Sequence, residues 1–184
     1  MAHTAHPDLL PVHGEHDILD GYLDTPVADL LRFHNLNAPL RSAGRPRVLI
    51  ATCSDPGIVL RVPRGFAYEL RVPGVHVDTL EFAVAFATAV GSVSDIAMIG
   101  HDDCAMSALA SHRDRFLHGL RTRAGWSAEA AEACFDDATA RFAIDDPIAN
   151  VRAQTARLRE RFPRMLVAPL FFAVREGRLL QVRE

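Results

Sequence analysis

Two apolar runs that each lead into a metal-ligating side chain constrain this chain more than any other feature. The first, Val48–Thr52, is followed directly by Cys53, and the second, residues 96–100, is followed by His101. Short continuous apolar runs of this kind are typical of buried parallel strands. Because open α/β sheets place their sites at the carboxyl ends of their strands, we expect the side chains that follow the two runs to meet.

Three of these side chains form a set that zinc prefers. Cys53, His101 and Cys104 would supply two thiolates and an imidazole, which leaves a fourth tetrahedral position open. Asp55 lies two residues beyond Cys53, so it is a candidate fourth ligand or a partner for a water held there. Thioredoxin-like redox chemistry would require Cys-x-x-Cys, which the sequence lacks, and Cys134 is expected to be an ordinary thiol. We therefore predict a Zn²⁺ site.

The same residues resemble the motifs of the β-class carbonic anhydrases. In that family one strand ends in Cys-x-Asp-x-Arg and a later strand ends in Gly-His-x-x-Cys. Here the motifs stand as Cys-Ser-Asp-Pro-Gly at residues 53–57 and Gly-His-Asp-Asp-Cys at residues 100–104. Residues 65–74 resemble the family's stretch that ends in Arg-Asn-Ala-Gly, and residues 79–84 resemble the helix that follows it. The resemblance runs from about Leu30 to the C-terminus.

One departure from the family pattern affects the expected chemistry. The Arg expected two residues after Asp55 is Gly57. In the family this Arg pairs with the Asp, and a guanidinium beside a carboxylate keeps it ionised and fixes its direction. Without it, Asp55 either moves onto zinc and closes the site, or accepts the water's hydrogen bond unaided. Arg61 and Arg64 are the candidates to replace the missing side chain.

The resemblance implies an enzyme, a zinc lyase that hydrates CO2 to bicarbonate by zinc-bound hydroxide. Asp55 is the expected catalytic residue, and His34 is a candidate proton shuttle. Activity is expected to be slow or to rise with pH, because hydroxide must displace a zinc-bound Asp55. Two alternatives stay open: a non-catalytic zinc protein with a closed Cys-Asp-His-Cys site in a structural or regulatory role, and a hydrolase of COS or CS2.

Further site residues follow from the stretch between the two ligand motifs. We expect Phe66 and Tyr68 to line a narrow apolar substrate channel, and Gly74 to permit a backbone turn beside it. Arg71 matches the Arg of the family's Arg-Asn-Ala-Gly sequence, and we expect it to support the site from near a subunit interface. Asp102 and Asp103, between two ligands, are expected to support the ligands or to face solvent rather than to bind zinc.

Composition excludes several classes of partner. The chain has 184 residues, 49% of them hydrophobic, and a formal net charge of -3, which gives no reason to expect nucleic acid or an anionic membrane as partner. The sequence has neither an apolar stretch of about 18 residues nor a secretory signal pattern, so we expect a cytoplasmic protein. Three cysteines argue against a disulfide framework and fit a reducing compartment.

The expected fold is a three-layer α/β domain with a mostly parallel central sheet, an antiparallel edge hairpin and flanking helices. Residues 1–24, which include four histidines, are expected to form a flexible tail, and residues 25–184 a single domain. Thr25-Pro26 and Asp146-Pro147 each predict the start of a helix. The helix expected at residues 77–90 is apolar nearly all round, so we expect it to pack between the sheet and a partner subunit in a homodimer or larger oligomer.

Overall fold

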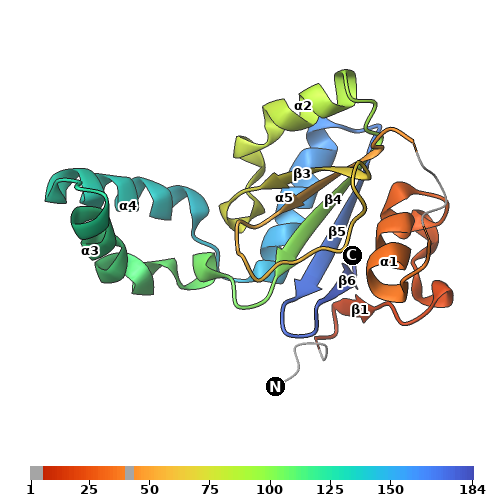
Figure 1. Ribbon diagram of the computed structural model, residues 1–184, viewed down its shortest axis with the longest axis horizontal. Helices are drawn as coiled ribbons and strands as arrows, with labels where there is room; N and C mark the ends of the chain where they lie inside the picture. The colour runs from red at the N-terminus through yellow and green to blue at the C-terminus, as the bar shows by residue number, and fades with distance from the viewer. Residues whose placement is uncertain (1–5, 40–43) are drawn as a thin grey trace.

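A six-stranded mixed sheet forms the centre of the computed structural model, which describes residues 6–39 and 44–184 (Figure 1). The strands lie in the order β1-β6-β5-β4-β2-β3, and β1 is the short strand Leu9–Pro11. Four neighbouring strands are parallel, and they are β2 (Val48–Thr52), β3 (Ala67–Arg71), β4 (Asp95–His101) and β5 (Leu166–Ala173). β6 (Arg178–Val182) returns antiparallel to β5. The predicted mostly parallel sheet with an antiparallel edge is therefore confirmed.

The pairing register of the adjacent strands β2 and β4 brings the ligand motifs to one edge of the sheet. Every residue of β2 and β4 is buried, as their apolar sequences predict. Thr52 pairs with Ile99, so Cys53 lies level with Gly100, one residue before His101. The carboxyl ends of the two strands thus place both motifs side by side.

Helices cover both faces of the sheet. Neighbouring residues of a strand point to opposite faces, so the contacts of two successive residues show what covers each face. A Cβ at Gly100, which faces α5 (Pro147–Arg161), would lie 3.4 Å from Phe171 on β5. The next residue, Phe172, contacts His34 on α1 (Pro26–Leu36) with ring centroids 5.7 Å apart. The predicted three layers are therefore present.

Both predicted helix starts are confirmed by their caps. The Thr25 hydroxyl accepts from the backbone nitrogens of the first turn of α1, and Asp146 does the same for α5. The helix expected at residues 77–90 is divided into a 3-10 turn, η5 (Val77–Thr79), and α2 (Glu81–Ala89). The remaining short 3-10 segments are η2 (Glu15–Asp17), η3 (Asp20–Tyr22), η4 (Pro73–Val75) and η6 (Ala105–His112).

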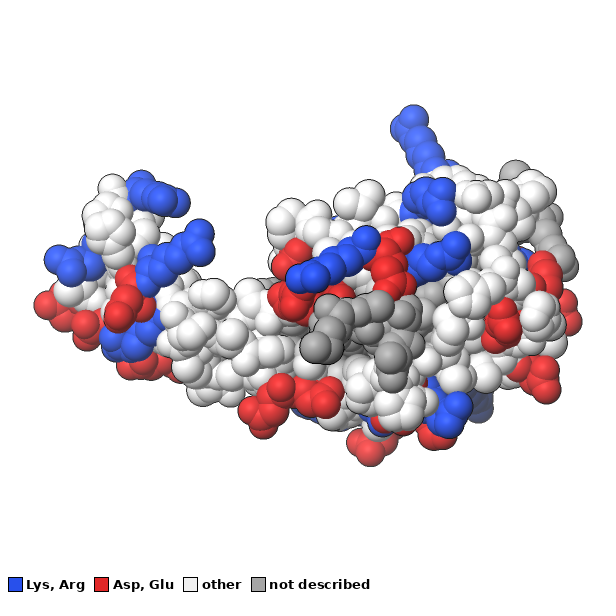
Figure 2. Space-filling view, turned by 90° about the horizontal axis from the view of Figure 1, so that it is seen from below, with Lys and Arg blue, Asp and Glu red and all other residues white. Residues whose placement is uncertain are grey.

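A helical hairpin made of α3 (Arg113–Arg123) and α4 (Ala128–Phe142) projects from the body as an arm (Figure 1). A small core of its own joins the two helices, where Phe116 and Phe135 lie 5.2 Å apart and Arg113 stacks over the Phe135 ring. Figure 2 shows the arm standing apart from the body, joined by a neck that carries few charged side chains on this face.

The flexible tail expected over residues 1–24 is wrong for residues 6–24. Leu9–Pro11 forms β1, which pairs antiparallel with the outer edge of β6. Val12, Ile18 and Tyr22 are buried against the core. The apolar residues of this segment are too scattered to show a period, but they cover an edge strand that would otherwise be open. Residues 1–5, including His3, lie outside the described part of the chain.

Among the described helices, none has the length and apolar character needed to cross a membrane.

Candidate metal centre

Cys53, His101 and Cys104 meet in the folded chain as the sequence predicts. Their ligand atoms all lie within 4.8 Å of one another, and all three side chains are buried. The two Sγ atoms are 3.9 Å apart. Tetrahedral zinc with Zn–S bonds of about 2.3 Å requires an S···S separation of about 3.8 Å, so the pair already has the spacing that zinc needs.

The buried imidazole of His101 supports a metal at this point. Neither ring nitrogen of His101 has a hydrogen-bond partner, although the side chain is only 2% exposed. Buried polar atoms are rarely left without a partner unless an ion or water completes them. The three side chains together therefore fit a bound zinc ion.

The two thiols lie within hydrogen-bonding distance of each other. The hydrogen bond from the Cys104 thiol lowers the pKa of Cys53 to about 4, with smaller contributions from His101 and from the backbone N–H groups of Gly74 and Asp55. The same pairing with Cys53, together with burial, raises the pKa of Cys104. Burial opposes charge on His101, yet the Cys53 thiolate raises its pKa. A buried cluster that gathers negative charge in this way favours a cation.

Two openings adjoin the ligands. A cavity of about 10 Å³, close to the size of one water, lies between the ligands, the Gly74–Val75 backbone and the first turn of α5. A larger groove of about 590 Å³ reaches Cys104 from the side of η6 and is bordered by acidic side chains and His112. The groove thus approaches the buried cluster from the side of Cys104.

Asp55 stands beside the three ligands but does not join them. Its Oδ1 accepts a hydrogen bond from the backbone nitrogen of Gly57 at 2.7 Å. Arg71 bonds the backbone of the loop that follows Cys53. Its two terminal nitrogens donate to the carbonyl oxygens of Asp55 (3.3 Å) and Ile58 (3.0 Å). Arg71 therefore supports the loop after Cys53 and does not contact the Asp55 carboxylate in these bonds.

Arg61 does not replace the missing arginine, so that prediction is wrong. Its guanidinium donates to Asn37 Oδ1 (2.8 Å) and to the carbonyl oxygen of His34 (2.7 Å), which directs it toward α1. Arg64 is exposed, and the described residues show no ion pair between Asp55 and either arginine. The carboxylate of Asp55 thus depends on a backbone donor.

Phe66 and Tyr68 lie at the far end of the sheet from the ligands. Tyr68 pairs with Leu49 near the start of β2, and Phe66 precedes the first paired residue of β3. Neither residue lines the cavity beside the ligands, so the predicted apolar channel is not formed by them within one chain. Gly74 does line that cavity, and its φ of 61° is the backbone turn that the sequence predicts.

Asp103 faces solvent, which is one of the two roles expected for it, whereas the role of His34 differs from expectation. Asp103 is exposed and lies 3.8 Å from Arg175, with no contact to a ligand described. Its neighbour Asp102 is the buried one, and it accepts from the Val174 backbone nitrogen at 2.8 Å. His34 is 1% exposed and both its ring nitrogens bond the backbone, so it is a structural residue rather than a proton shuttle.

Two polar residues on α5 belong to the site and were missed. Asn150 lines the cavity, and both Asn150 and Gln154 bond the segment that carries Gly74. Their spacing of four places them on one helix face, and that face packs on the β3–α2 connection. Two amide side chains four residues apart on the predicted helix were the available signal.

No family model matches the chain. A carbonic anhydrase of Pseudomonas aeruginosa is 33% identical over 161 residues, covering 78% of this chain and 72% of that protein. A β-carbonic anhydrase of Trichomonas vaginalis has the same fold, with a TM-score of 0.62 at 18% identity over 82% of this chain and 91% of that one. A carbon disulfide hydrolase has a TM-score of 0.58 at 15% identity, covering 86% and 87% of the two chains. Sequence identity, fold and the Cys-His-Cys cluster agree, and the chain belongs to the β-carbonic anhydrase family.

Proposed function

We propose that the chain binds one Zn²⁺ through Cys53, His101 and Cys104 and catalyses the reversible hydration of CO2 to bicarbonate. The observation that supports this most strongly is the convergence of the three ligand atoms within 4.8 Å, with a sulfur spacing suited to tetrahedral zinc. When bound, zinc supplies a water of lowered pKa as the nucleophile.

The protein's own groups would hold and orient the reactants. Because Gly57 N–H occupies Oδ1 of Asp55, the other carboxylate oxygen is the one we assign to accept the nucleophile's hydrogen bond. Arg71 fixes the main chain at Asp55, which limits how far the carboxylate can swing. The proton would leave toward solvent through the groove that reaches Cys104.

A closed, non-catalytic site is the second candidate. The cavity beside the ligands holds about one water, and among the described residues no arginine bonds the carboxylate of Asp55. In this alternative Asp55 is the fourth ligand and zinc serves stability or regulation. Hydrolysis of COS or CS2 is a third reading, and the likeness to a carbon disulfide hydrolase extends to the fold alone.

Stopped-flow measurement of CO2 hydration at pH 7 and pH 9, on protein of measured zinc content, distinguishes these candidate functions. The expected result is a rate that follows zinc content, rises with pH and disappears in Cys53→Ser. Cys134→Ser is the matched control, because Cys134 lies on α4 outside the cluster. Full zinc content with no CO2 hydration at either pH would contradict catalysis of this reaction, and COS and CS2 would then be assayed on the same sample.

We also propose that the chain forms a homodimer through α2. Phe82, Phe86 and Val90 form an apolar stripe that is 82%, 55% and 66% exposed. Their spacing of four residues aligns them on one face, and a stripe of this kind is typical of a contact surface. A cytoplasmic location is proposed with it, because an oxidising compartment would favour a disulfide between the two neighbouring ligand thiols.

A further inference from the structure

The turn beside Cys53 has an unfavourable backbone conformation. Gly74 and Val75 have φ angles of 61° and 57°, and a β-branched residue such as Val rarely adopts a positive φ. A Cβ on Gly74 would lie 2.8 Å from the His76 ring, so only glycine fits there. Conformations of this kind cost about 1–3 kcal/mol and persist only where surrounding contacts impose them.

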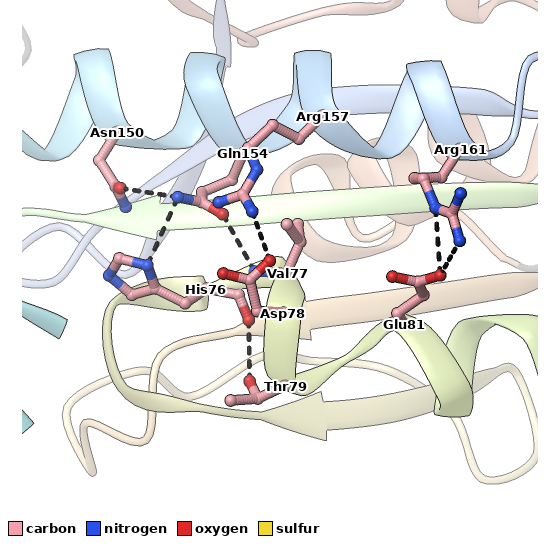
Figure 3. A network of polar contacts seen from close by, with 9 residues as sticks. All are labelled: His76, Val77, Asp78, Thr79, Glu81, Asn150, Gln154, Arg157 and Arg161. Atoms are coloured by element: carbon pink, nitrogen blue, oxygen red, sulfur yellow. Dashed lines mark hydrogen bonds and ion pairs between the residues drawn. The ribbon is translucent and has the colours of Figure 1, made fainter. Parts of the chain in front are cut away.

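Two amides of α5, the half-buried Asn150 and the buried Gln154, supply those contacts, and Figure 3 shows both side chains. Asn150 Nδ2 donates to the carbonyl oxygen of Gly74 at 2.7 Å, and Gln154 Oε1 accepts from the backbone nitrogen of Val77 at 3.0 Å. These two bonds hold the backbone on either side of Val75, at the Gly74 carbonyl oxygen and at the Val77 nitrogen. The turn is thus held from one helix face at both of its ends.

The bonds also fix which way each amide points. Since Gln154 Oε1 accepts from Val77, its Nε2 faces both His76 Nδ1 and Asn150 Oδ1, each at 3.4 Å. His76 Nδ1 must therefore be an acceptor, which leaves the imidazole neutral. The half-buried ring packs edge-on against Phe142, with centroids 5.6 Å apart. Each amide is bonded through both its oxygen and its nitrogen.

Further along the same face, α5 continues the contact with exposed ion pairs. Arg157 pairs with Asp78 and Arg161 pairs with Glu81 (Figure 3). Exposed pairs of this kind contribute little, about 0–1 kcal/mol. The face therefore has an inner pair of amides near the metal centre, Gln154 buried and Asn150 half-buried, and a solvent-exposed outer pair of arginines.

We propose that Asn150 and Gln154 are positioning residues of the metal centre. They hold the Gly74–Val75 turn so that it closes one side of the small cavity that Cys53, His101 and Cys104 also line. The proposal rests on the metal site proposed above. Partners that support metal ligands from behind change affinity by roughly 10–100-fold when removed, which sets the size of the expected effect.

Gln154→Met tests the proposal, because it keeps the volume and removes every hydrogen bond of the side chain. Zn²⁺ affinity is measured by competition with a chelator, and the sulfur-to-metal absorption band is recorded on Co²⁺-loaded protein. We expect Gln154→Met and Asn150→Ala each to weaken Zn²⁺ binding by about 10–100-fold and to shift the band. The control, Arg157→Gln with Arg161→Gln, breaks the outer pair and should leave affinity within about twofold.

The outcomes separate this inference from the proposed function. Folded Gln154→Met with wild-type affinity and an unshifted band would overturn the positioning role while zinc binding stands. If Gln154→Met does not fold, Asn150→Ala decides in the same way. If wild-type protein binds no zinc, the proposed function fails, and hydrogen exchange of the Gly74 and Val77 amides decides instead. Faster exchange of these two amides in Gln154→Met than in the arginine control supports the role of Gln154 in holding the turn, and equal exchange in the two proteins contradicts it.

Discussion

Asp55 Oδ1 lies 2.7 Å from the backbone nitrogen of Gly57, the residue that stands where related sequences carry an arginine. A backbone donor thus orients the carboxylate that a guanidinium would otherwise orient. A side chain at position 57 would be crowded, because a Cβ there would lie 3.0 Å from Asp55 Oδ1 and 3.0 Å from Val174 Cγ1. A side chain at this position requires both neighbours to shift.

Restoring the arginine should raise activity once room is made for it. In Gly57→Arg with Val174→Ala, we expect CO2 hydration several-fold faster than wild type at pH 7, because a guanidinium beside Asp55 keeps it ionised and off the metal. Stopped-flow rates per bound zinc measure the effect. Val174→Ala alone is the control, and an equal gain in it would show that space rather than charge is responsible.

Removing a thiolate ligand should release the metal without unfolding the sheet. Cys104→Ser is expected to lose stoichiometric zinc after dialysis, since a serine hydroxyl does not replace a thiolate on zinc. Atomic absorption gives the zinc content, and circular dichroism checks the fold. Cys134→Ser, half-buried on α4, should retain full zinc, and loss of zinc there would mean that the ligand set is misassigned.

Arg71 should matter through its geometry as well as its charge. Its two terminal nitrogens donate to the carbonyl oxygens of Asp55 and Ile58, and the planar fork of a guanidinium holds two such acceptors in a fixed geometry that the compact ammonium of lysine does not provide. We expect Arg71→Lys and Arg71→Ala to lower kcat by similar factors, on the order of tenfold, with zinc content unchanged. Full activity in Arg71→Lys would show that charge alone suffices.

His34 should make stability depend on pH. Its Nδ1 accepts from the Arg61 backbone nitrogen and its Nε2 donates to the Gly177 carbonyl, so only the neutral ring satisfies both. Burial lowers the pKa of His34 below 6.5, and the positive charges of Arg61 and Arg178 add to the effect. The unfolded chain then binds the proton more readily, so this stability is complete above pH 6.5 and is lost as pH falls below it.

Urea unfolding at pH 7.5 and pH 5.5 measures that dependence. The free energy of unfolding should fall more for wild type than for His34→Gln, whose amide does not titrate. Other histidines, including the half-buried His76, contribute equally to both proteins and cancel in the comparison. Identical losses in the two proteins would count against the proposed role of His34.

Charge on the α2 stripe should dissociate the proposed dimer. We expect Phe82→Glu with Phe86→Glu to be monomeric by light scattering at micromolar concentration, where wild type is dimeric, because two carboxylates would be buried in the contact. Glu132→Gln on α4 serves as a surface control and should remain dimeric. A wild-type monomer under these conditions would contradict the dimer itself.

The sequence predicts local features well because they depend on local chemistry. The apolar runs before Cys53 and His101, and the caps at Thr25 and Asp146, each specify their element without distant information. The strand Leu9–Pro11 could not be predicted in this way, since three residues form a strand only where an open edge receives them.

The candidate site shows the same division. The three ligands follow from two strand ends, whereas Asn150 and Gln154 contact a turn about 75 residues earlier in the chain. Phe66 and Tyr68 were placed in the pocket by sequence proximity, but the register of β3 sets them at the opposite end of the sheet. Contacts that depend on register or on distant packing were the ones that sequence patterns did not reveal.

The two outer strands of the sheet each discourage extension by another chain. β1 is only three residues long and ends in Pro11, which offers no N–H to a further strand. At the other side, β3 presents exposed Glu69 and Arg71. Short strands, proline and charge are the usual means of preventing edge-to-edge aggregation. Copies of this protein should therefore meet through helices and resist stacking into continuous sheets, even in concentrated solution.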